Sequence, residues 1–172
     1  MTEILFYHLQ GQRIEGMLPV LLEKSLERGW KVIVQGASEE RLEALDAHLW
    51  TYRDDAFLPH GTWREPDAAV QPVLLTLTDS NPNDASVRFL IDGAPVPADA
   101  EAYQRIVLLF DGEDDDAVAT ARACWSAVLP GASKSLRFCS SWVPSAEIAH
   151  VTLPGVYCSG ANSSIGALGS LR

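Results

Sequence analysis

The sequence has few of the residues from which metal sites, disulfide frameworks and nucleic-acid surfaces are built. Its three cysteines, Cys124, Cys139 and Cys158, are odd in number and widely spaced, which fits neither a zinc pattern nor a disulfide framework. The four histidines form no His-x-x-x-His pair. The net charge of −10 leaves no clustered basic side chains to neutralise phosphates. We therefore expect no metal, no cofactor and no broad nucleic-acid-binding surface.

Long apolar runs and an export signal are also missing. No stretch approaches the roughly 18 apolar residues that a membrane helix requires. The start, Met1-Thr2-Glu3-Ile4, lacks the basic residues of a secretion signal. We expect a cytoplasmic protein without membrane contact. A length of 172 residues, 47% of them hydrophobic, suits one domain with a substantial core.

Motifs for phosphate binding and nucleophilic catalysis are absent where a sequence of this kind would carry them. A P-loop ends in Gly-Lys-Ser/Thr, whereas Gly16 is followed by Met17 and Leu18. Neither G-x-G-x-x-G nor G-x-S-x-G occurs. The acidic run 113–116 fits a solvated helix start better than a set of metal ligands. We assign no catalytic residue, and a nucleotide-dependent α/β enzyme is the alternative.

Strand and helix patterns alternate along the first three quarters of the chain. Short apolar runs predict strands, and apolar residues spaced three and four apart predict helices. Ser38 is placed to cap the second helix, and Gly29 to end the first. The pattern predicts one α/β domain over residues 1–128, with an open, mostly parallel sheet flanked by helices. The predicted strands cover 3–9, 31–34, 72–77, 86–91 and 105–110, and the predicted helices cover 14–26, 38–49 and 114–128.

The last quarter of the sequence, residues 129–172, has a different composition. It is rich in Ser and Gly, and its only charged residues are Lys134, Arg137, Glu147 and Arg172. Apolar periodicity fades there as well. We interpret 129–172 as an atypical segment whose order the pattern does not define. It is either an unusual extension or a stretch read in a shifted frame, and resequencing the 3′ end of the gene distinguishes the two.

Two groups of surface residues suggest protein binding. Trp50 ends the second predicted helix, and the loop after it offers Phe57 and Pro59; large apolar groups around one loop can form a pocket for an aromatic side chain. Alternatively, Trp50 caps the core. Arg122 and Trp125 lie three apart on the third helix, where a guanidinium can bind a carboxylate while the ring packs apolar groups. The alternative there is an arginine lying over a core tryptophan.

Three segments resemble a known family. Phe6-Tyr7-His8-Leu9, then Leu45-Asp46 with Leu49-Trp50, and then Phe57-Leu58-Pro59-His60 are similar to the chi subunit of bacterial DNA polymerase III. The resemblance covers about residues 1–128. It implies one α/β domain with a sheet like that of nucleotide-binding folds but without a nucleotide site. It also implies a non-catalytic accessory subunit of the DNA-polymerising holoenzyme, a nucleotidyltransferase complex, that acts in DNA replication.

The resemblance further implies partners and a site. Members of the family link the clamp loader to the C-terminal tail of single-stranded DNA-binding protein, which ends in Pro-Phe, and they bind the psi subunit where one is present. DNA is then reached only indirectly. Val118 and Ser126 stand where the family carries basic residues. The positions that match the family's partner-binding residues are Trp50, Phe57, Pro59, Arg122 and Trp125.

Overall fold

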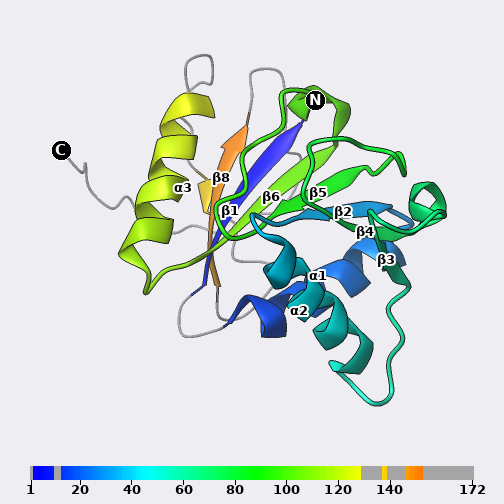
Figure 1. Cartoon of the computed structure of the whole chain (residues 1–172). Coiled ribbons are helices and arrows are strands. Elements are labelled where there is room, and N and C mark those ends of the chain that lie inside the picture. The colour runs from blue at the N-terminus through cyan, green and yellow to red at the C-terminus, as the bar shows by residue number, and fades with distance from the viewer. Residues whose placement is uncertain (1, 10–12, 129–136, 139–145, 153–172) are drawn as a thin grey trace.

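A computed structural model describes residues 2–9, 13–128, 137–138 and 146–152. A central sheet carries helices on both of its faces (Figure 1). Two short 3-10 helices, Ala68–Val70 and Ala100–Ala102, lie in connections. The main elements, in chain order, are β1 (Glu3–Leu9), α1 (Ile14–Glu27), β2 (Val32–Gln35), α2 (Glu39–Thr51), β3 (His60–Thr62), β4 (Val73–Thr76), β5 (Val87–Leu90), β6 (Arg105–Asp111), α3 (Asp115–Val128), β7 (Arg137–Phe138) and β8 (Ala146–Thr152).

The sheet has the strand order β3-β4-β2-β5-β6-β1-β8-β7. Strands β1 to β6 pair in parallel, whereas β8 runs antiparallel to β1 and β7 antiparallel to β8. The central strands β2, β4 and β5 are buried at every position, as expected for parallel strands that are covered on both faces. The predicted α/β fold with an open, mostly parallel sheet is therefore confirmed.

Alternating side chains of the strands divide the core into two layers. Leu5 and Tyr7 of β1 contribute to the layer that α1 and α2 cover. Ile4 and Phe6 point to the other face, into the layer that includes Ala121 of α3. Figure 1 shows α3 on the opposite side of the sheet from α1 and α2. Surface residues of α2 and α3 therefore belong to opposite faces of the molecule.

The helix ends follow from local sequence. The side-chain oxygen of Ser38 accepts a hydrogen bond from the Arg41 backbone N–H at 3.3 Å, as an N-cap does. The chain leaves α1 through Gly29, whose φ of 75° is the left-handed conformation that glycine adopts most readily. No described helix is both long and apolar enough to span a membrane.

Three strands of the structure were not predicted from the sequence. β3 has only three residues, too few to show a pattern, and it forms through pairing with β4. β7 and β8 lie within 129–172, where the periodicity fades, and β8 pairs with β1 from Leu9 to Glu3. Tertiary pairing thus overrides a weak local signal in these strands. The rest of that segment lies outside the described residues.

A buried arginine lies between β5 and the loop that follows β4. Arg88 is 0% exposed, and its guanidinium lies 4.9 Å from the centre of the Tyr103 ring. Its terminal nitrogens donate hydrogen bonds to two side chains and three backbone carbonyls. These acceptors are Gln35 Oε1 (2.6 Å), Tyr103 Oη (2.6 Å), and the carbonyls of Thr78 (3.2 Å), Asp79 (2.8 Å) and Ser80 (2.6 Å). All five acceptors are uncharged oxygens, so the loop after β4 is held in place by the buried charge of the guanidinium.

Candidate functional site

Two aromatic side chains lie exposed next to each other at the end of α2. Trp50 is 56% exposed and Phe57 73% exposed, and their ring centroids are 6.1 Å apart at a tilt of 48°. Pro59, in the same loop, is half-buried. We call Trp50, Phe57 and Pro59 the aromatic surface. Because folded domains usually bury such rings, a pair of this kind in solvent is a candidate interaction surface.

A buried histidine packs against the aromatic surface. The ring of His60 lies 4.7 Å from that of Trp50, and its side chain is 0% exposed. Its Nδ1 lies 2.8 Å from the backbone oxygen of Leu58, and its Nε2 lies 3.3 Å from Oδ1 of Asp46. Asp46 and His60 were not predicted as site residues from the sequence. A signal was present, since Asp46 follows Leu45 and His60 follows Pro59 in two of the matching segments.

Several carboxylates lie on α2 and in the loop that carries the aromatic surface. Glu43, Asp46 and Trp50 are spaced three and four apart, so they share one side of α2. The nearby arginines are already paired. Arg53 binds Asp55 at 2.6 Å and Glu23 at 3.3 Å, and Arg64 binds Glu43 at 3.0 Å as well as Glu39. The rim therefore disfavours an acidic peptide and favours a partner that brings basic side chains.

Arg122 lies on a different face of the molecule. It is an exposed residue of α3, the helix that packs on β6, whereas the aromatic surface adjoins β3. Four strand spacings separate β3 from β6, which corresponds to roughly 19 Å across the sheet. The structure thus brings Trp50, Phe57 and Pro59 together but does not bring Arg122 to them. Trp125 is a residue of α3, and its side chain lies outside the described part of the chain.

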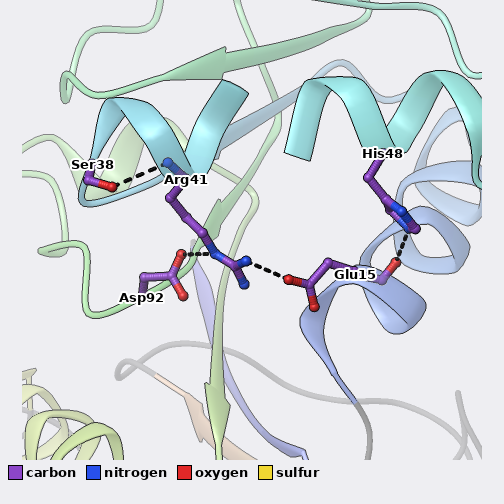
Figure 2. Close-up of polar contacts among 5 residues, drawn as sticks. All are labelled: Glu15, Ser38, Arg41, His48 and Asp92. Carbon is purple, nitrogen blue, oxygen red and sulfur yellow. Dashed lines mark hydrogen bonds and ion pairs between the residues drawn. The ribbon is translucent and has the colours of Figure 1, made fainter. Parts of the chain in front are cut away.

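The carboxyl ends of the parallel strands are where nucleotide-binding folds hold their ligands. Here an ion-pair network lies near that position (Figure 2). Arg41 of α2 binds Oε1 of Glu15 on α1 at 2.5 Å and Oδ2 of Asp92, after β5, at 2.9 Å. His48 Nε2 lies 2.9 Å from the backbone oxygen of Glu15. Because Arg41 already has two carboxylate partners, the network ties three elements together rather than offering a phosphate cradle.

A cavity of about 810 Å³ opens beside this network, between α3 and the carboxyl ends of β5 and β6. Its walls are mainly apolar, with Leu90, Leu108 and Phe110 among them. The carboxylates on its lining are those of Asp92, Asp111, Asp114 and Asp116. Carboxylates repel phosphate, so the cavity does not favour the nucleotide-dependent alternative.

The Arg41 network makes the stability of the folded protein depend on pH. Burial raises the pKa of Glu15, but a backbone hydrogen bond and Arg41 outweigh it, so the pKa lies below its ordinary value of 4.5. A carboxyl group whose pKa is lowered on folding stabilises the protein at pH values above its unfolded-state pKa. That stabilisation is lost as the pH falls through its folded-state pKa. We expect Glu15→Gln to be less stable than the unaltered protein at pH 7, with a difference that narrows below pH 4.5.

Urea unfolding of Glu15→Gln and the unaltered protein at a series of pH values measures this narrowing. Glu27→Gln, at an exposed position of the same helix, is the matched control and should show no comparable pH dependence. A stability difference that stays constant through the acid range would show that Glu15 is not ionically coupled to Arg41.

Comparison with known proteins agrees with the resemblance read from the sequence. The family model "DNA polymerase III chi subunit, HolC" matches residues 1–129. A relative named "Probable DNA polymerase III subunit chi" from Rickettsia prowazekii is 27% identical over 117 residues, which cover 64% of this chain and 71% of that protein. The "DNA polymerase III subunit chi" of Pseudomonas aeruginosa is 35% identical over 80 residues, 45% of this chain and 55% of its own. The chain therefore belongs to the DNA polymerase III chi subunit family.

Proposed function

We propose that the protein is a non-catalytic accessory subunit of the bacterial replicative polymerase, and that it joins two partners through two separate surfaces. The observation that supports this most directly is the placement of the exposed Trp50–Phe57 pair and of Arg122 on opposite faces of the sheet. An adaptor needs two surfaces that can be occupied at once. The protein acts in the cytoplasm, where the replication machinery works.

The surface around Arg122 suits the C-terminal tail of single-stranded DNA-binding protein. A guanidinium binds a terminal carboxylate through two parallel hydrogen bonds, and such capture is a recurring mode of peptide recognition. Seven residues separate Arg122 from Asp115 in the first turn of α3, or roughly 10 Å along the helix axis. A tail that places its terminal carboxylate at Arg122 and extends away from that turn avoids the acids there.

The aromatic surface suits the partner that belongs to the clamp loader, the psi subunit where one is present. Exposed aromatic side chains are the usual anchors of protein interfaces. Arg53 and Arg64 are each shared between two carboxylates, so the charge near Trp50 is net negative. That charge would repel the acidic tail, which supports a role for this surface in binding the second partner. Together the two contacts raise the local concentration of the polymerase on coated single strands. With a net charge of −10, the protein reaches DNA only through its partners.

Titration with a fluorescent peptide that ends in Asp-Ile-Pro-Phe tests the first contact. We expect saturable binding with a Kd of about 1 µM, because a short disordered peptide loses conformational entropy on binding. Arg122→Ala and a peptide with an amidated C-terminus should each weaken binding at least about tenfold, the effect of losing one charged hydrogen bond.

Arg53→Ala is the matched control, since Arg53 is an exposed arginine beside the aromatic surface. It should leave the peptide affinity unchanged. Equal affinity for the free and amidated peptides would rule out carboxylate capture. Weaker peptide binding by Arg53→Ala, with unchanged binding by Arg122→Ala, would show that the tail binds at the aromatic surface instead.

A further inference from the structure

The buried ring of His60 presents a nitrogen without a hydrogen bond toward a carboxylate. The carbonyl oxygen of Leu58 can only accept, so Nδ1, at 2.8 Å, carries the hydrogen and donates it. In the neutral ring, Nε2 is then a bare acceptor. It is buried, makes no hydrogen bond, and lies 3.3 Å from Oδ1 of Asp46. Two acceptors face each other, and a proton between them turns this contact into a charge-assisted hydrogen bond.

The same ring is the support on which Trp50 rests. The centroids of the His60 and Trp50 rings are 4.7 Å apart and the planes are tilted by 45°, so the indole lies partly over the imidazole. When the imidazole gains a proton, its positive charge attracts the π face of the indole. The protonation state of the His60–Asp46 pair therefore acts on the ring that dominates the aromatic surface.

We propose that His60 and Asp46 are positioning residues for Trp50, and that a proton shared between them holds the exposed indole in the orientation that a partner contacts. This inference rests on the proposed function only for the identity of the partner. The coupling between the pair and the indole is a property of the isolated protein.

The other charged groups near the pair have partners of their own. Glu43 of α2 binds Arg64, and Glu65, which follows β3, accepts hydrogen bonds from the backbone and hydroxyl of Thr62. Arg53, in the loop after α2, binds Asp55 and Glu23. Asp46, with a side chain 30% exposed, is the carboxylate placed within 4.0 Å of His60. The pair can therefore be altered at Asp46, near the surface, without opening the core.

Fluorine NMR of the full chain labelled with 5-fluorotryptophan tests this coupling. The resonance of Trp50, one of five tryptophans, is assigned with Trp50→Phe. We expect its position to depend on whether the side chain at position 46 can hydrogen-bond Nε2 of His60. In Asp46→Asn, the amide can donate a hydrogen bond to Nε2, so the resonance should stay close to its position in the unaltered protein. Asp46→Leu supplies no donor or charge, so its resonance should lie away from that position.

Capture of purified clamp-loader complex at neutral pH supplies the second readout. Asp46→Asn should retain the affinity of the unaltered protein, and Asp46→Leu should lose about tenfold. A Trp50 resonance that lies at the same position in Asp46→Leu as in the unaltered protein would overturn the proposed coupling. If the resonance behaves as expected but neither variant nor the unaltered protein captures the complex, the positioning role stands and the proposed function fails.

Discussion

Replacing Arg88 with methionine is expected to lower the free energy of unfolding by roughly 3–5 kcal/mol, because several buried oxygens lose a donor at a cost of about 1–3 kcal/mol each. Methionine fills a similar volume but donates no hydrogen bond. The side-chain oxygens of Gln35 and Tyr103 would remain buried without their donor, as would the three loop carbonyls. The effect should exceed that of losing any exposed ion pair in the chain.

Chemical denaturation followed by circular dichroism measures this loss directly. The matched control is Arg53→Met, at an arginine whose side chain is 53% exposed, which should leave the unfolding midpoint nearly unchanged. Arg88→Lys separates the effect of charge from that of geometry. Its ammonium group carries the charge but cannot reach five acceptors arranged around a planar guanidinium, so this variant should be destabilised as well. Equal midpoints for Arg88→Met and Arg53→Met would mean that the network contributes nothing.

The double substitution Trp50→Ala with Phe57→Ala is expected to weaken capture of the clamp-loader complex by about 30-fold or more, as loss of central aromatic anchors does. Both side chains are exposed, so the fold should tolerate their removal. The tail peptide, which we assign to Arg122 on the opposite face, should bind within about twofold of its original affinity, as expected for independent sites.

Surface plasmon resonance with immobilised complex and with immobilised peptide provides both affinities from one preparation. Val70→Ala is the control, since Val70 is 68% exposed but lies outside the aromatic surface, and it should affect neither. Arg122→Ala should give the reverse result: its affinity for the peptide should fall, and its affinity for the clamp-loader complex should be unchanged. Loss of both ligands in the aromatic double variant would show that the two partners share one surface.

Much of the fold could be predicted because its signals are local. The continuous apolar runs of β1 and β6 and the spacing of Met17, Leu18, Leu21 and Leu22 in α1 depend only on neighbouring residues. β3 could not be predicted, because its three residues become a strand only through β4. β8 depends in the same way on β1, and its segment has no apolar alternation that marks it in isolation.

The candidate site was predictable in its parts but not in its arrangement. Exposed aromatics near Pro59 and an arginine on the third helix are visible in the sequence. The aromatic residues and the arginine are far apart because α2 and α3 cover opposite faces of the sheet. The sequence pattern does not specify which face a helix covers. The resemblance therefore grouped Trp50 with Arg122, and the structure places them on α2 and α3, on opposite faces. His60 and Asp46 lay within the matching segments, but their mutual contact needs the α2–β3 turn.

The position of β1 between β6 and β8 has a consequence for how the protein is made. β1 leaves the ribosome well before its neighbour, since 102 residues separate Glu3 from Arg105 on β6. At synthesis rates of about 5–20 residues per second, β1 waits roughly 5–20 s for that partner, and longer for β8. During that interval the unpaired N–H and C=O groups along its two edges are open to other chains. β1 is thus translated long before it is enclosed on both sides by β6 and β8, and it can associate with other chains throughout that interval.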